Sequence, residues 1–264
     1  MTSLLIYGCG NMGGAMLAGW LGSDVPLQVT VVDPAVAEVP AGVRLLRQVP
    51  PERFDVVLLG IKPQMLGELA PALAPAIGPG TVLLSVLAGA EIASLAGHFP
   101  VNGGIVRVMP NLAAAIGKAP IGLFGKVPED TARRVTDLMI PLGSPEWLAS
   151  ETDLDAVTAL AGSGPAFVYR FIAALAEGGA ALGLDSAQAQ RLAVSMVEGA
   201  AALAAGSGEA PAQLARRVTS AGGTTAAGLS VLDADAALTR LVSATLKAAA
   251  DRGDELAAAV RGEV

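Results

Sequence analysis

The sequence has few of the side chains that bind metals, form disulfides or assist a nucleophile. Its 264 residues include one cysteine, Cys9, and one histidine, His98. A single cysteine cannot form a disulfide within the chain, and no Cys/His cluster exists, so no metal site is expected. A Ser-His-Asp hydrolase would depend on His98 alone. That histidine is expected in a loop before a strand, as a surface or packing residue.

Charged residues are also scarce. They make up 16% of the chain, and the net charge is −7. The chain therefore lacks the basic surface that nucleic-acid binding requires, and no nucleic-acid partner is expected. An acidic balance repels polyanions as a class, but it permits one small anionic metabolite in a local pocket.

No leader and no membrane span are expected. The first apolar run follows a start without a basic residue, unlike a signal peptide. The longest uncharged stretch, residues 69–90, has the length of a span, but three prolines and three glycines interrupt it. The stretch predicts a helix, a turn and a buried strand, and the expected location is the cytoplasm.

Residues 1–150 alternate short β-rich runs with helical stretches. Continuous apolar runs are typical of strands buried on both faces of a parallel sheet, so the alternation predicts a doubly wound α/β domain. The expected strands are Leu4–Gly8, Gln28–Asp33, Val56–Ile61, Thr81–Val86 and Gly104–Met109, with possible additions at Ile121–Phe124 and Glu146–Leu148. The expected crossover helices are Gly13–Leu21 and Pro63–Leu73.

Residues 151–264 differ in composition. They hold 33 alanines against 19 in residues 1–150, and they contain no comparable β-rich runs. The expected helices are Phe167–Leu182, Ser186–Ala205 and Ala236–Val260. These helices are apolar round much of their circumference and must be buried. The pattern predicts an all-α domain that forms much of a homodimer interface, with a self-contained bundle as the alternative.

A glycine motif follows the first expected strand. Gly8-Cys9-Gly10-Asn11-Met12-Gly13 fits GxGxxG, a helix follows it, and Asp33 ends the next strand 20 residues after Gly13. Together these features predict a Rossmann dinucleotide-binding unit. Gly8 permits the tight turn, Gly10 lets the backbone approach the pyrophosphate, and Gly13 lets helix and strand pack closely. Asn11 and Met12 complete the motif before the helix and are expected to bind the cofactor, and the helix N-terminus supplies N–H groups for the phosphates. The alternative is a glycine-rich turn without a ligand.

The roles of Asp33 and Cys9 each have two interpretations. Asp33 would accept hydrogen bonds from the ribose 2′-OH, which favours NADH or use of both cofactors, or it caps a turn before Pro34. No arginine follows within ten residues, and Arg44 is the nearest. Cys9 at a helix N-terminus could be reactive, although a small filler inside the loop is the favoured interpretation.

Further candidates follow other strands, where ligands of open α/β sheets bind. Lys62 and Pro63 come after the strand at 56–61, and Lys62 either reaches the cofactor or is solvated. Ser85–Gly89, which includes Ala88 and Gly89, could pass beneath the nicotinamide. Asn111 either orients an amide or holds a turn.

Two loops of small residues precede helices in the second part. Ala161–Pro165 reads as a helix start, with Ser163 near the cap and Pro165 at the first helical position. Ser220–Thr225 offers consecutive backbone N–H groups and three hydroxyls, a cradle suited to a carboxylate. Ordinary helix capping is the alternative for both loops. Glu151, Asp153 and Asp155 suit a helix start, or a place beside a cationic nitrogen.

The whole chain resembles pyrroline-5-carboxylate reductases. The shared motifs are Gly8–Met12, Ile61–Gln64, Met109–Asn111, Asp155–Thr158, Gly162–Ala166 and, most specifically, Arg217–Leu229. The family usually has proline at Ala221, serine at Ala161, tyrosine at Phe167 and Thr-Pro at 112–113. These departures affect loop shape more than the reaction.

The resemblance implies hydride transfer from NADPH or NADH to the C=N carbon of 1-pyrroline-5-carboxylate, which gives L-proline. It implies that the Gly223, Thr224 and Thr225 amides, beside Gly222 and with the Ser220 hydroxyl, hold the substrate carboxylate. Thr225 would lie near the ring nitrogen as the catalytic hydrogen-bond partner or as a proton relay. It also implies a homodimer whose two chains share each active site, and assembly of five dimers into a decamer.

Two other functions remain open. A 3-hydroxyacid reductase of similar architecture needs a base, typically a lysine, but no lysine occurs from residue 127 to residue 246. An imine arrives protonated and needs no strong enzymatic acid, so the scarcity of Lys and His favours imine reduction. A catalytically silent dinucleotide-binding scaffold would not need the 220–225 cradle.

Overall fold

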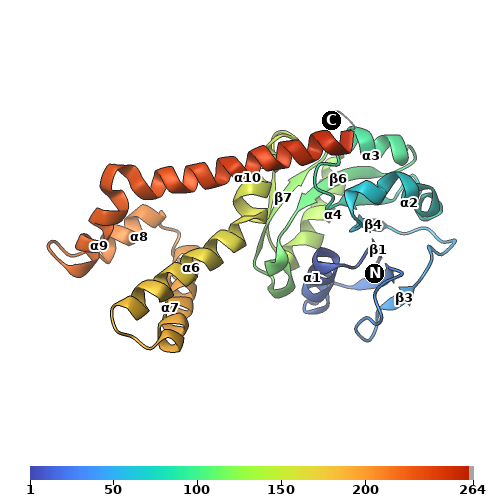
Figure 1. The fold of residues 1–264 in the computed structure, drawn as a ribbon. Helices are drawn as coiled ribbons and strands as arrows, with labels where there is room; N and C mark the ends of the chain where they lie inside the picture. Colours follow the sequence, from blue (N-terminus) through green and yellow to red (C-terminus); the bar gives the residue numbers. More distant parts are fainter. Residues whose placement is uncertain (262–264) are drawn as a thin grey trace. The chain divides into compact units, whose positions relative to one another are not determined.

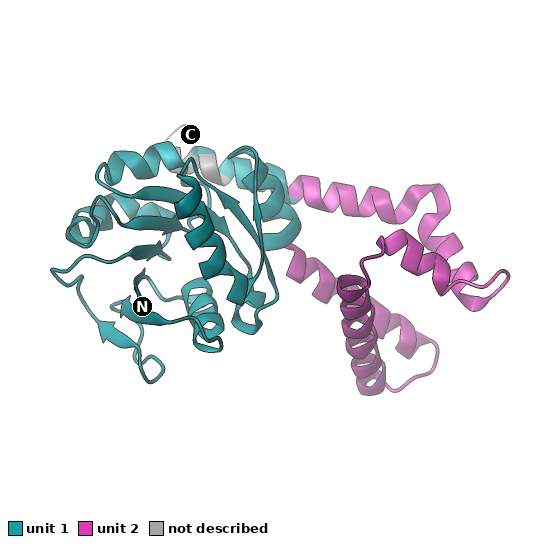
Figure 2. Cartoon of the chain, turned by 180° about the vertical axis from the view of Figure 1, so that it is seen from behind, with its two compact units in different colours: residues 1–162, 249–264 teal, residues 163–248 magenta. Residues whose placement is uncertain are grey.

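The chain forms two compact units in this computed structural model, which describes residues 1–261. The first unit comprises Met1–Gly162 and the chain from Ala249 onward, and the second comprises Ser163–Ala248 (Figure 2). The sequence placed the domain boundary at residue 150. The first unit extends beyond that point because Leu154 is 1% exposed in its core.

An eight-stranded sheet forms the centre of the first unit, in the order β3-β2-β1-β4-β5-β6-β7-β8 (Figure 1). The six strands β1 to β6 are parallel to one another. Strand β7 is antiparallel to β6, and β8 is parallel to β7. The strands are β1 (Thr2–Tyr7), β2 (Leu27–Val32), β3 (Arg44–Leu46), β4 (Val56–Leu59), β5 (Val82–Ser85), β6 (Gly104–Met109), β7 (Ala119–Phe124) and β8 (Gly143–Trp147). The topology confirms the predicted doubly wound sheet. Its strand order reverses direction between β1 and β4, where such sheets bind ligands.

Helices cover both faces of this sheet. Alternate residues of β1 face opposite sides, so Leu4 and Ile6 belong to one core cluster while Leu5 and Tyr7 belong to the other. Helices α1 and α4 contribute to the first cluster, and α2 and α3 to the second. The bounds are α1 (Asn11–Leu21), α2 (Leu66–Leu73), α3 (Ile92–His98), α4 (Glu129–Met139) and α5 (Asp153–Val157). Short helical turns occupy Pro63–Met65, Ala74–Ala76, Leu112–Ile116, Ile140–Leu142 and Thr158–Gly162.

Three of these elements were not predicted from the sequence: β3, α3 and α4. Strand β3 has only three residues, and α4 is mostly polar, with an apolar stripe at Val135, Leu138 and Met139. The loop expected at His98 is wrong, because His98 is the last residue of α3, where it is exposed.

The second unit consists of helices, as the sequence predicted. They are α6 (Gly164–Ala181), α7 (Ser186–Ser207), α8 (Pro211–Arg217), α9 (Thr224–Asp233) and the first part of α10 (Ala237–Arg261), with a short turn at Ala234–Ala236. Of the described residues in α6, α8 and α9, none is buried, and α7 buries only Ala189 and Ala193. Large apolar side chains are exposed on several helices, including Tyr169 at 69% and Leu241 at 66%. These helices therefore lack the cover that their composition requires.

One helical stretch among the described residues, Asp153–Ala181, is long and apolar enough to cross a membrane by length and composition. Only 6% of its most apolar window is buried in the chain. By itself this is weak evidence of a span, since a helix that packs against another protein passes the same test.

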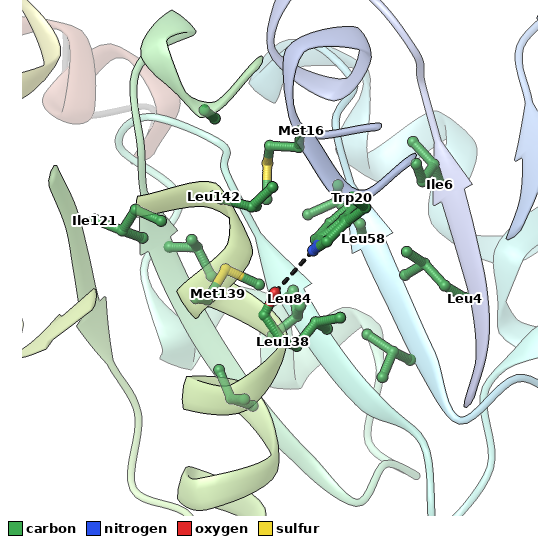
Figure 3. Packing of buried hydrophobic residues seen from close by; sticks show 14 of the residues in the cluster. Leu4, Ile6, Met16, Trp20, Leu58, Leu84, Ile121, Leu138, Met139 and Leu142 are labelled. Carbon is green, nitrogen blue, oxygen red and sulfur yellow. Dashed lines mark hydrogen bonds between the residues drawn. The ribbon is translucent and has the colours of Figure 1, made fainter. Parts of the chain in front are cut away.

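Trp20 links α1 to α4 inside the first core cluster. Its side chain is 2% exposed, and its indole Nε1 donates to the carbonyl oxygen of Leu138 at 2.8 Å (Figure 3). Trp20→Phe keeps an aromatic ring but removes the donor from a buried carbonyl, which should lower the free energy of unfolding by about 1–3 kcal/mol. Urea titration followed by circular dichroism measures this loss.

Trp147→Phe is the matched control. The indole of Trp147 donates to Thr136 Oγ1 at 2.9 Å, but Trp147 is 36% exposed, so water can replace the bond. Its loss should change stability by no more than about 0.5 kcal/mol. Equal effects of the two substitutions would mean that burial of the Trp20 bond is unimportant.

Candidate active site

The glycine loop lies where β1 and β4 end side by side. Gly8 has a φ of +91°, and a Cβ there would lie 2.8 Å from the carbonyl carbon and oxygen of Gly60. A Cβ on Gly60 would in turn collide with the Gly8 carbonyl oxygen, and the Gly60 N–H donates to the Tyr7 carbonyl at 2.9 Å. The two backbones therefore touch with no room for a side chain on either residue.

The other two glycines of the motif differ from each other. A Cβ on Gly13 would lie 2.6 Å from the Gly8 carbonyl oxygen, so α1 packs directly on the loop. A Cβ on Gly10 would have nothing within 4 Å, and Gly10 has a φ of −72° that any residue adopts. Gly10 is the N-cap of α1, so the N–H groups of Asn11, Met12 and Gly13 have no acceptor within the helix. Gly10 thus leaves open space in front of a helix N-terminus that favours anions.

The carboxylate of Asp33 holds this loop in place by accepting hydrogen bonds from backbone N–H groups. Its Oδ2 accepts a hydrogen bond from the Cys9 N–H at 2.8 Å. Its Oδ1 accepts from the N–H groups of Ala35 at 2.8 Å and Val36 at 3.2 Å. Both carboxylate oxygens therefore bind protein backbone, which is the turn-capping arrangement that the sequence left as an alternative. Oδ1 already accepts two bonds, whereas Oδ2 accepts one and can take one more, so the ribose contact stays a prediction.

Cys9 packs partly against the first core cluster. Burial, and secondarily the negative charge of Asp33, raise the pKa of its thiol above the ordinary value. A raised pKa lowers the thiolate fraction and therefore the reactivity of the sulfur. Both observations favour the packing interpretation of Cys9.

A cavity of about 690 Å³ lies over the ends of these strands. It brings together four residues that the sequence predicted to bind cofactor, namely Gly8, Gly10, Asp33 and Lys62. The remaining predicted cofactor residues do not line it: Asn11, Met12, Gly13, Pro63, Ala88, Gly89 and Asn111. Gly60 and Arg47 are among the lining residues that the sequence did not predict. A glycine directly after a buried strand and before Ile61 was the available signal for Gly60.

The predicted residues after β4, β5 and β6 occupy strand ends or the loops that follow. Lys62 is exposed and precedes the turn that Pro63 begins. Ala88 is exposed, and Gly89 has a φ of +74°. Asn111 is buried; its Oδ1 accepts from the Ala113 N–H at 2.9 Å and its Nδ2 donates to the Ala161 carbonyl at 2.9 Å. Asn111 therefore holds a turn and ties it to the segment before α6.

An ion pair between the buried Arg107 and the half-buried Glu151 lines a small cavity together with Gly89. Arg107 of β6 has a side chain that is 6% exposed, and its Nη1 lies 2.9 Å from Glu151 Oε1. The same oxygen accepts from the Ile92 N–H at 2.8 Å, at the start of α3. The sequence predicted Glu151 at a helix start and did not predict a role for Arg107, because their ion pair joins segments that are distant in the chain. Burial, the largest cause, raises the pKa of nearby Asp155.

The predicted carboxylate cradle belongs to the second unit. Gly222 has a φ of +70°, and the Gly223 N–H donates to the Ser220 carbonyl at 3.1 Å, closing a turn. Gly223 is the N-cap of α9, so the N–H groups of Thr224 and Thr225 have no acceptor within the helix. Ser220, Thr224 and Thr225 are exposed. Two of the three predicted amide donors are thus available, while the third already serves the turn.

The sheet order, the glycine loop and the cavity at the switch point define a dinucleotide-binding protein of the Rossmann class, joined to a helical unit. A family profile described as pyrroline-5-carboxylate reductase dimerisation matches residues 151–256. The chain is 35% identical over 264 residues to pyrroline-5-carboxylate reductase of Pseudomonas aeruginosa, with 96% of each chain covered. The chain belongs to the pyrroline-5-carboxylate reductase family.

Solved structures agree with this membership. The structure of a pyrroline-5-carboxylate reductase from Coxiella burnetii has a TM-score of 0.89 at 27% identity, covering 97% of this chain and 98% of the other. A Plasmodium falciparum pyrroline carboxylate reductase with NADP bound has a TM-score of 0.82 over 97% and 98% of the two chains. At 24% identity, the second likeness shows the fold alone.

The different surroundings of the loop glycines give a testable contrast. Gly10→Ala should leave the melting temperature unchanged but weaken nucleotide binding, because its Cβ enters the space before the α1 N-terminus. Gly60→Ala should lose about 1–3 kcal/mol of stability as well, because its Cβ meets protein backbone. Thermal unfolding and calorimetric titration with NADP⁺ and NAD⁺ measure the two effects. Full nucleotide affinity in Gly10→Ala would contradict this placement of the ligand.

Proposed function

We propose that the protein is an NAD(P)H-dependent reductase that converts 1-pyrroline-5-carboxylate to L-proline, the last step of proline biosynthesis. The observation that carries this proposal is the 35% identity, over 96% of both chains, to a curated enzyme of that name. Mixing the protein with pyrroline-5-carboxylate and NADPH or NADH, then following nicotinamide absorbance, tests it directly. Oxidation of neither cofactor would contradict it.

The residues present fit a dinucleotide. The open space at Gly10 is a cradle that a side chain would fill, and the α1 N-terminus presents unpaired amides to it. We assign cofactor binding to this loop together with Asp33, Lys62, Pro63, Ala88 and Gly89, and we assign Asn111 to positioning the loop after β6 through the turn that its side chain holds. Bound NADPH or NADH would supply the hydride that reduces the C=N carbon.

The cradle before α9 suits the substrate carboxylate. The amides of Thr224 and Thr225 point along a helix N-terminus, and the Ser220 hydroxyl is exposed beside them. We assign the carboxylate to these groups within the loop that Gly222 and Gly223 shape. The Thr225 hydroxyl would then hydrogen-bond to the ring nitrogen.

Imine reduction also suits the shortage of titratable groups. The C=N nitrogen is basic enough to arrive protonated, so positioning by amides and hydroxyls is sufficient, and no strong acid is required. A 3-hydroxyacid reductase would need a base, and the helical part has no lysine before Lys247.

We propose a division of labour at residue 150, with cofactor binding in residues 1–150 and dimerisation and substrate binding in residues 151–264. The exposed apolar helices of the second unit support a homodimer, in which a second copy rather than a membrane covers them. Five dimers would form a decamer, and the enzyme would act in the cytoplasm.

Thr225 gives a test of the catalytic assignment. Thr225→Val keeps the shape of the side chain but removes the hydroxyl, and kcat should fall by about 10²-fold or more. Thr225→Ser keeps the hydroxyl and should retain most of the activity. Cofactor affinity, measured by calorimetry, should be the same in both variants. Equal losses of kcat and cofactor affinity would contradict the assigned role.

Leu241 gives a test of the dimer. It is 66% exposed on α10, and Leu241→Glu places a charge on a face that a second copy should cover. The mass measured by light scattering should fall to that of a single chain. Val101→Glu, at a 57% exposed site of the first unit, is the control and should leave the mass unchanged. A wild-type mass of ten chains would support the decamer.

A further inference from the structure

Two opposite charges line the part of the cavity next to the turn that follows β2. One is the carboxylate of Asp33, and the other is the guanidinium of Arg47, which comes directly after β3. Arg47 Nη1 donates to the carbonyl oxygens of Asp33 at 2.9 Å and Val36 at 2.5 Å. The turn therefore holds the guanidinium beside the residue that marks the ribose position in this fold.

The carboxylate of Asp33 is engaged by three backbone N–H groups, on Cys9, Ala35 and Val36. Hydrogen bonds to an ionised acceptor are among the stronger ones, and here they fix both oxygens toward the protein. Asp33 therefore links the glycine loop to the turn after β2. Its loss should disturb the loop whatever the ligand carries at the ribose.

Arg47 has donors to spare. A guanidinium carries five N–H groups in a planar fork, and within residues 1–261 only Nη1 makes hydrogen bonds. Arg47 is exposed at the cavity, so Nε and Nη2 can reach a ligand. Arg44 differs from Arg47 in two ways: it does not line the cavity, and its charge is paired, since Nη1 lies 2.5 Å from Glu52 Oε1. A planar fork of this kind matches the geometry of phosphate oxygens.

We infer that Arg47 binds the 2′-phosphate that distinguishes NADPH from NADH, and that Asp33 braces the glycine loop instead of excluding that phosphate. The inference rests on the proposed function in taking the ligand as a nicotinamide dinucleotide. It also changes the expectation from sequence, which found no arginine within ten residues of Asp33. Strand β3 brings one from fourteen residues further along the chain.

Binding of nucleotide fragments tests Arg47 apart from catalysis. Adenosine 2′,5′-bisphosphate carries the 2′-phosphate, and 5′-AMP lacks it. Arg47→Met keeps the length of the side chain without the charge, and calorimetry should show bisphosphate affinity reduced about 10- to 100-fold with AMP affinity nearly unchanged. Arg47→Lys should lie between them, because an ammonium retains charge but not the fork. Arg44→Met, the matched control, should affect neither fragment.

Asp33→Asn completes the test. An amide cannot accept hydrogen bonds at both of its ends, so the brace is broken on one side and both fragments should bind more weakly by a similar factor. A selective gain in bisphosphate affinity would show that Asp33 excludes the phosphate and would overturn the inference. Equal effects of Arg47→Met on the two fragments would overturn it as well.

The outcomes also separate this inference from the proposed function. Bisphosphate binding that depends on Arg47, in a protein that does not reduce pyrroline-5-carboxylate, would uphold the inference and contradict the reductase. Reductase activity of the wild type, with unchanged bisphosphate affinity in Arg47→Met, would uphold the reductase and contradict the inference. Failure of the wild type to bind either fragment would overturn the inference and the cofactor assignment together.

Discussion

The contact between the backbones of Gly8 and Gly60 is the constraint on which the candidate cofactor site depends. It joins the ends of β1 and β4, the two central strands on either side of the switch point. The turn at Gly8 can then pass over the sheet into α1, and Gly13 seats that helix on the Gly8 carbonyl. A side chain at this contact would push the two strand ends apart. The loop, the end of β4 and α1 can pack this closely because Gly8, Gly60 and Gly13 have no Cβ.

The central strands could be predicted because they are buried on both faces and leave continuous apolar runs in the sequence. Strand β3 could not, since it has three residues at the sheet edge and includes the exposed Arg44. Helix α4 is mostly polar and buries only one narrow apolar stripe, so its apolar content does not predict a helix. Both elements form because of tertiary contacts: β3 pairs with β2, and α4 packs on the sheet. Local composition does not indicate either contact.

The same distinction separates the predicted part of the site from the rest. The glycine motif is local, so its spacing alone indicated the loop and its helix. Three residues have contacts that local sequence does not reveal: Gly60 meets Gly8, Arg47 binds Asp33, and Arg107 pairs with Glu151. Asp33 was found by its place after β2, but its bond to the Cys9 amide depends on the folded loop. Motifs identify residues, whereas tertiary pairing determines what their atoms bind.

The bare helices of the second unit have a thermodynamic consequence. Helices α6, α8 and α9 bury no described residue within one chain, so most of their stabilisation has to come from association. The free energy of this half of the molecule then follows mass action, and dilution weakens it as surely as denaturant does. Newly made chains would hold a folded first unit before the helical second unit is secured. Protein concentration itself thereby sets the fraction of complete enzyme.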